Sequence, residues 1–298
     1  MTVLLAFGMG YSATETARRL SRRGWRIIGT GRSHASLAGI AHDGFTAIPF
    51  GGAGNVSLEL ADGVLAATHI LTSVPPDEQG DPVLRACAPL IAQAPALQWI
   101  GYLSTIGVYG DHGGGWIDEE TPVNPMSARS KARVAAEREW ADLGARCGAT
   151  VDIFRLAGIY GPGRSPFERL RAGESHRVFK PGQVFNRIHV DDIATTVIAA
   201  MDRPSRSGET RIFNVTDDEP APPQDVTAFA AVLIGRTPPP LLPFEQAQLS
   251  DMARSFYNEN KRVKNERIKT SLGVTLRHPT YREGLRAIAD GLRAPSDA

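Results

Sequence analysis

The chain opens on an apolar run, Thr2–Phe7, that leads into closely spaced glycines and then into apolar residues at helical spacing. This order predicts a strand, a tight turn and a helix. A glycine at position 8 permits the turn, and one at position 10 lets the backbone approach a pyrophosphate. A small residue at position 13 lets the helix pack closely on the strand, while the N–H groups at the helix start favour negative charge. We therefore predict a dinucleotide site with contacts from Gly8, Gly10, Tyr11, Ser12 and Ala13.

The end of the second predicted strand indicates which dinucleotide binds. Trp25–Thr30 reads as a strand and is followed by Gly31, Arg32 and Ser33. A site for NAD usually has an acidic residue here, which accepts hydrogen bonds from the ribose hydroxyls. The guanidinium of Arg32 and the hydroxyl of Ser33 suit a 2′-phosphate instead. The sequence predicts a preference for NADP(H), with NAD(H) possible; the alternative is a solvated arginine that starts a loop.

Composition excludes several classes of function. The 298 residues are 42% hydrophobic, which is enough for a sizeable core, and 33 Lys and Arg balance 32 Asp and Glu. No net field attracts nucleic acid or an anionic membrane, so we expect neither as a partner. Cys87 and Cys147 have no metal or redox spacing, so we predict no metal. The short apolar start resembles neither a signal peptide nor a membrane span, and we expect a cytoplasmic protein.

Strand-like and helix-like segments alternate along the first half of the chain, a pattern typical of a parallel sheet covered on both faces. We predict an α/β fold, a Rossmann-type doubly wound parallel sheet with a small C-terminal lid subdomain. The dinucleotide-binding domain is expected over residues 1–157 and completed by about 188–216. Gly- and Pro-rich stretches mark residues 158–187 and 217–298 as the substrate-side lid. Asp191 or Asp192 is expected to cap the helix predicted over Ile188–Met201.

Four later stretches, together with the glycine turn, carry a family resemblance. They are Leu103–Gly110, the helix that contains Lys131, Arg155–Gly163 and Arg187–Ile193. Taken in this order they resemble the extended and atypical short-chain dehydrogenase/reductases, the NAD(P)-dependent sugar-nucleotide epimerase/dehydratase family. The resemblance covers about residues 2–290.

The resemblance implies roles for particular residues. Thr105 matches the hydroxyl that hydrogen-bonds the reacting carbonyl or alcohol, and Lys131 matches the lysine that holds the nicotinamide ribose. Ile159 lies in the loop that packs on the nicotinamide, and Arg187 falls where related enzymes approach the substrate. Each has a purely structural alternative: a strand-end cap for Thr105, a surface charge for Lys131 and a hinge ion pair for Arg187.

One position departs from the family pattern. The family's proton donor is a tyrosine four residues before the lysine, one helical turn away, and Ser127 stands there. A serine hydroxyl is too weak an acid to replace it unaided. Tyr109 or a water is then the expected substitute acid.

Two functions from different classes follow. The first is an NADP-dependent sugar-nucleotide epimerase or reductase of the atypical type, acting on a small molecule that could be a nucleotide sugar. The second is a non-enzymatic sensor or regulatory protein that binds NADP(H). The resemblance also implies a homodimer, in which the helices predicted over Pro82–Ala94 and Met126–Leu143 pair with their copies. These helices carry more apolar residues than one buried face needs, which favours the same prediction.

Overall fold

The computed structural model describes residues 1–52, 56–173, 176–203 and 206–293. Its centre is a seven-stranded sheet in which every neighbouring pair is parallel, as predicted. The spatial order is β11–β7–β5–β4–β1–β2–β3. Strands β2 and β3 are added on one side of β1, and the later strands, from β4 on, are added on the other side, so the strand order reverses between β1 and β4. Ligands of such sheets bind outside the carboxyl ends of the strands at this point. The strands are β1 (Val3–Phe7), β2 (Arg26–Gly31), β3 (Thr46–Pro49), β4 (His69–Thr72), β5 (Trp99–Thr105), β7 (Thr150–Leu156) and β11 (Thr210–Val215).

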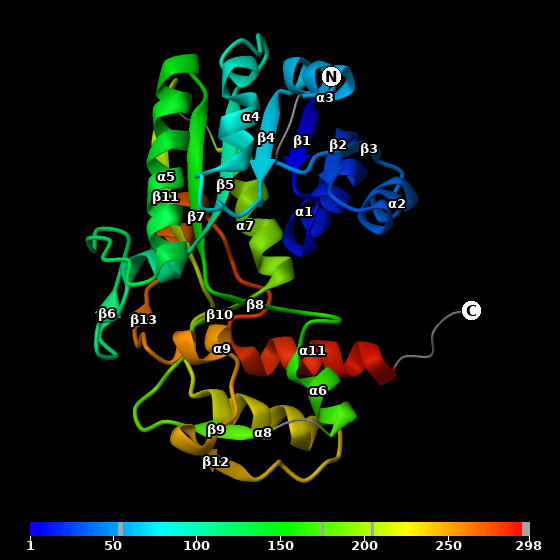
Figure 1. Cartoon of the computed structure of the whole chain (residues 1–298). Helices are drawn as coiled ribbons and strands as arrows, with labels where there is room; N and C mark the ends of the chain where they lie inside the picture. The colour runs from blue at the N-terminus through cyan, green and yellow to red at the C-terminus, as the bar shows by residue number, and fades with distance from the viewer. Residues whose placement is uncertain (53–55, 174–175, 204–205, 294–298) are drawn as a thin grey trace.

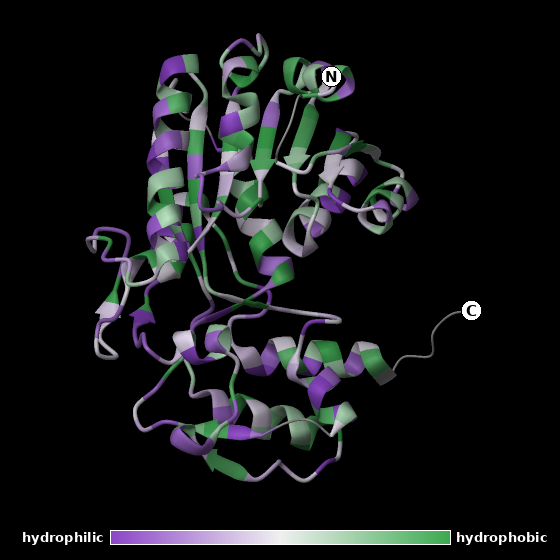
Figure 2. Cartoon of the chain, in the orientation of Figure 1, coloured by the Kyte–Doolittle hydropathy of each residue, from purple (hydrophilic) through white to green (hydrophobic). Residues whose placement is uncertain are grey.

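Helices cover both faces of this sheet, and each face has its own apolar core (Figures 1 and 2). One face packs against α3 (Leu58–Ala66), α4 (Pro82–Ile91) and α5 (Ala128–Cys147). The other face packs against α1 (Tyr11–Arg22), α2 (His34–His42), α7 (Val190–Asp202) and α10 (Glu266–Leu272). Most residues of the seven strands are buried, because helices cover both faces of the sheet.

A smaller unit lies below the carboxyl ends of the strands in Figure 1. Its separate core joins residues of three helices, α6 (Pro166–Ala172), α8 (Pro223–Leu233) and α11 (Tyr281–Arg293). Strand β9 (Arg177–Phe179) pairs with β12 (Leu241–Pro243), which leads into the short helices η2 (Phe244–Gln246) and α9 (Asp251–Phe256). Strand β8 (Gly158–Tyr160) follows β7 but is not part of the central sheet. It pairs with β10 (Arg187–His189), which leads the chain back to the sheet through α7. This unit is built from the segments predicted as the lid, and its role over a substrate stays a prediction.

The predicted lid segment 217–298 is not all lid. Its residues 294–298 lie outside the described part, and two of its elements pack on the nucleotide-binding domain. Helix α10 contributes Ile268 to the core beneath the sheet, followed by Val274 and Leu276. Strand β13 (Arg262–Val263) pairs with β6 (Trp116–Ile117), beside the 3-10 helix η1 (Ile106–Tyr109). No described helix is long and apolar enough to cross a membrane.

The surface argument for a homodimer is wrong. Val83, Leu84 and Ile91 of α4, which it counted as surplus, are buried within the single chain. Charged residues occupy the exposed side of α5: Arg138, Glu139, Asp142 and Arg146. The homodimer itself stays a prediction without this support.

A buried ion pair fixes α5 against the sheet. Glu137 of α5 accepts hydrogen bonds from Arg155 of β7, with its Oε2 2.7 Å from the Nη2 of Arg155. The same carboxylate accepts a hydrogen bond from Ser104 of β5. Both members of the pair are about 5% exposed. Removing one partner of such a pair leaves an uncompensated buried charge, so the register between α5 and the two strands is strongly held.

The buried imidazole of His69 should make the fold sensitive to acid. The ring lies between Trp25 and Trp99, with centroid distances of 4.6 and 6.0 Å, and burial lowers the pKa of His69 to about 4. The neutral ring is bound more strongly in the folded state. Its stability contribution is therefore complete above the unfolded pKa of 6.5 and is lost as pH falls through 4, at a cost of about 3 kcal/mol.

Urea unfolding across this pH range checks the prediction. His69→Phe keeps an aromatic ring and should flatten the pH dependence, whereas His42→Gln at an exposed position should not. Equal pH dependence in the parent and His69→Phe would contradict it.

Candidate active site

The glycine turn has the geometry that a dinucleotide site requires. Gly8 has a φ of 75°, and a Cβ there would lie 3.0 Å from the Cγ2 of Val74. Its N–H donates to the Oγ1 of Thr30 at the end of β2. Gly10 precedes α1, and no side chain caps that helix start. The first turn of α1 is therefore open to an anion at the carboxyl end of β1.

The first residues of α1 have separate roles. Ala13 is fully buried, as close packing of the helix requires, and Ser12 is nearly so. The hydroxyl of Tyr11 instead donates to the carbonyl of Pro162 at 2.9 Å, in the loop after β8. Burial raises the pKa of Tyr11 to about 12, so the phenol keeps its proton near neutral pH. Tyr11 thus joins the glycine turn to the chain that enters the lid.

Arg32 and Ser33 follow β2 as predicted. Arg32 is exposed beyond the strand end, so its guanidinium is accessible to a ligand. Ser33 caps α2, where its Oγ accepts a hydrogen bond from the N–H of Ser36 at 3.2 Å. A capping hydroxyl keeps its own proton for donation.

Three hydroxyl groups lie together at the carboxyl end of β5. Thr105 is half-buried, and its Oγ1 accepts from the N–H of Gly107 at 3.1 Å. A Cβ placed on Gly107 would lie 3.4 Å from that oxygen and 3.3 Å from the Oγ of Ser130, so the two hydroxyls flank this glycine. Ser127 caps α5 and donates to Ser130 Oγ at 3.0 Å.

Arg133 is a cation of α5 that contacts the last part of β5. Successive helical residues turn by about 100°, so side chains two positions apart point to roughly opposite sides. The Nη1 of Arg133 donates to the carbonyl of Leu103 at 2.9 Å and to the hydroxyl of Tyr102 at 3.1 Å. Lys131 is exposed. Its contact with a nicotinamide ribose stays a prediction.

The sequence analysis missed Arg133 because it considered only the lysine that the family pattern leads one to expect. The signal was the inward face of the helix, where buried residues recur at Ser130, Val134, Glu137 and Trp140. Arg133 borders that face and Lys131 does not.

Tyr109 does not fit the role of substitute acid. Its side chain is fully buried, and its hydroxyl donates to the Oδ1 of Asn214 at 2.8 Å. The guanidinium of Arg155 lies 4.8 Å from the centre of its ring. Burial raises the pKa of Tyr109 above its usual value. The phenol is a packed part of the core with no route to a substrate, so this prediction is corrected.

Ile159 and Arg187 lie on adjacent strands where the chain passes between the two units. Ile159 of β8 is half-buried and is paired with Ile188 of β10. The Nη1 of Arg187 donates to the carbonyls of Phe185 and Ala221, at 2.9 and 3.1 Å. In this structure Arg187 joins backbone segments, which is close to its structural alternative. Its contact with a substrate stays a prediction.

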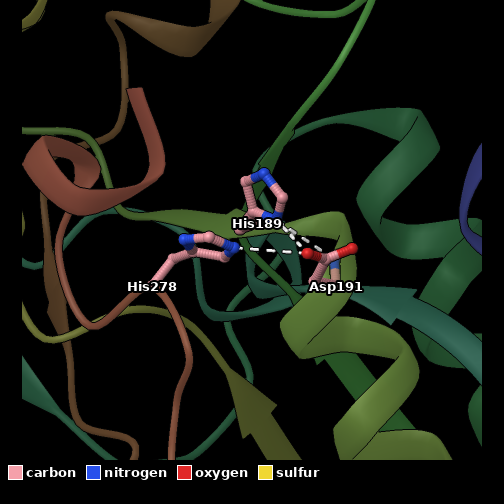
Figure 3. A group of neighbouring side chains, drawn as sticks. All are labelled: His189, Asp191 and His278. Carbon is pink, nitrogen blue, oxygen red and sulfur yellow. Dashed lines mark hydrogen bonds and ion pairs between the residues drawn. The ribbon is translucent and has the colours of Figure 1, made fainter. Parts of the chain in front are cut away.

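The cap of α7 differs from the predicted one. His189 precedes the helix, and its Nδ1 accepts from the N–H of Asp191 at 3.2 Å. Asp192 instead accepts hydrogen bonds from the backbone N–H groups of Arg277 and His278. Asp191 contacts His189 and His278 (Figure 3), and it also pairs with Arg19. The hydrogen bond from His278 is the largest cause that lowers the pKa of Asp191 to about 2.

Comparisons with known proteins agree with this geometry. Residues 83–216 match the model of the NAD dependent epimerase/dehydratase family. A solved structure of a functionally unknown conserved protein from Silicibacter pomeroyi DSS is 48% identical, with a TM-score of 0.88 over 98% of this chain and 100% of that one. Protein YeeZ of Escherichia coli (strain K12) is 29% identical over 78% of this chain and 84% of its own length.

A more distant structure shares the fold. The human epimerase family protein SDR39U1 (isoform2), solved with NADPH, is 17% identical, with a TM-score of 0.71 over 97% of this chain and 99% of that one. The glycine turn, the parallel sheet and these matches lead to one conclusion: residues 83–216 are similar to the NAD dependent epimerase/dehydratase family, and the whole chain shares the fold of these solved structures.

Proposed function

We propose that this protein is an NADP(H)-dependent enzyme of the atypical type, a reductase or epimerase acting on a small molecule such as a nucleotide sugar. The observation that carries the proposal is the grouping of Arg133, Thr105 and Ser130 at the carboxyl end of β5. A cation and hydroxyl donors at this edge can stabilise an oxyanion beside a bound nicotinamide.

Arg32 supports the choice of NADP(H) over NAD(H). It is the first residue after β2, it is exposed, and Ser33 beside it offers a hydroxyl. A planar guanidinium pairs with a phosphate through two hydrogen bonds, whereas the two ribose hydroxyls of NAD offer it no charge.

In the proposed reaction Arg133 replaces the family's lysine. Its guanidinium would hold the nicotinamide ribose and would place a fixed positive charge beside the developing oxyanion. A guanidinium does not give up its proton in proteins, so Arg133 can stabilise charge but cannot act as the acid. The proton would reach the substrate from water through the connected hydroxyls of Ser127 and Ser130, near Thr105.

The second candidate is a sensor that binds NADP(H) without turnover. It is favoured by Ser127, which stands at the position of the expected tyrosine and is occupied as the cap of α5. Incubation of the protein and NADPH with a panel of nucleotide sugars and carbonyl compounds separates the two. Micromolar NADPH binding without any turnover would favour the sensor.

Arg32→Ala should weaken NADPH binding about 10- to 150-fold, the worth of one charge-assisted hydrogen bond, and leave NADH binding nearly unchanged. Calorimetric titration with both cofactors measures this. Arg22→Ala is the matched control, because Arg22 is an exposed arginine at the last residue of α1. Equal affinity of the parent for NADPH and NADH would contradict the proposed preference.

Arg133→Met should weaken cofactor binding and lower turnover by about 10²–10³, because it removes the charge at both the ribose and the oxyanion. Lys131→Met, at an exposed residue two positions away on the same helix, should change neither. The pair is compared by NADPH titration and by initial rates, with thermal melts to confirm folding. The reverse pattern, with Lys131→Met inactive, would restore the sequence-based placement.

Thr105→Val should lower turnover by about 10²–10³ while NADPH affinity stays nearly unchanged, because it removes a donor to the oxyanion alone. Initial rates and NADPH titration on the same preparation test this. Loss of NADPH affinity equal to the loss of rate would instead show that Thr105 serves the cofactor.

A further inference from the structure

Two buried histidines and a carboxylate from distant parts of the chain meet beside the start of α7 (Figure 3). The Oδ2 of Asp191 lies 3.2 Å from the Nε2 of His278 and 3.7 Å from the Nδ1 of His189. All three atoms lie within 4.8 Å of one another, and both imidazoles are at most 4% exposed. Among the described residues this is the one group of three or more such side chains that could share an ion.

We propose that His189, Asp191 and His278 bind one divalent transition-metal ion, with Zn²⁺ as the species to test. Imidazole nitrogen and carboxylate oxygen are zinc ligands at about 2.0–2.2 Å, so ligand atoms of a tetrahedral site lie roughly 3.3 Å apart. The spacings of 3.2 and 3.7 Å are close to that value. Three protein ligands leave the fourth position to water, which can enter beside the partly exposed Asp191.

The surroundings both shape and weaken this site. Arg19 of α1 pairs with the other carboxylate oxygen, Oδ1, at 3.0 Å, which orients the carboxylate and leaves Oδ2 to the ion. Against binding stand the positive start of α7, the charges of Arg19 and Arg277, and the hydrogen bond from the Asp191 N–H that His189 must give up. Micromolar affinity, weaker than that of structural zinc sites, is the expected result.

A bound ion would reinforce the junction between the two units. Asp191 lies on α7, which packs on the sheet, and His189 ends β10 just before it, whereas His278 lies in the segment that leads into α11 of the smaller unit. Asp192 already holds this segment through the backbone N–H groups of residues 277 and 278. The metal would add a second attachment at the same place, and it would do so without the cofactor.

Titration of the metal-free protein with Zn²⁺ by calorimetry tests the proposal, and Co²⁺ serves as a probe whose visible absorption reports the ligand geometry. We expect one ion per chain, micromolar affinity and a higher melting temperature with Zn²⁺. His278→Phe keeps a ring in the cluster and should weaken binding at least tenfold, and so should Asp191→Asn. His42→Gln, at an exposed histidine on α2, should bind as the parent does.

Absence of saturable Zn²⁺ uptake by the parent would overturn the proposal. Equal affinity in the parent and Asp191→Asn would overturn it too, since the ion would then lie elsewhere. Both readouts are independent of turnover, so the outcome is separate from the test of the proposed enzyme.

Discussion

The ion pair between Glu137 and Arg155 is the contact on which the arrangement of the candidate site depends. It fixes α5 against β7, and the hydrogen bond from Ser104 adds β5 to the same carboxylate. Arg133 lies one helical turn before Glu137, so the pair also sets how far Arg133 extends along β5. Charges this deeply buried tolerate little displacement, because any shift leaves one of them without a partner. The register of one helix therefore sets the position of the proposed oxyanion donors.

Much of the fold could be predicted from local patterns. The alternation of strand-like and helix-like segments predicts the parallel sheet, and the seven parallel strands confirm it. The glycine turn was equally clear, since Gly8, Gly10 and Ala13 have the spacing of a dinucleotide-binding turn and stand between a strand and a helix. The later segments were harder. Helix α10 packs in the core beneath the sheet, but it has only seven residues. An apolar pattern this short does not show which unit a helix joins.

The candidate site was predicted less well, and for physical reasons. A search for the family's residue types leads to Lys131, yet only helix phase decides which side chain meets the strand, and that phase selects Arg133. Tyr109 follows β5 closely in sequence, but η1 turns its ring into the core against Arg155. The N-cap of α7 is His189, and histidine is outside the usual set of N-cap residues. In each case the deciding information lay in three dimensions.

The chain crosses between its two units several times, and this has a consequence for how the molecule comes into being. The lid core joins α6 and α8 to α11, which lies near the end of the described chain, while α10 between them packs beneath the sheet. A ribosome must therefore release the chain through α11 before the lid can close its core. Contacts of such long sequence separation slow folding. Until then the residues of α6 and α8 that pack on α11 are exposed to solvent. A chaperone is most useful during this period.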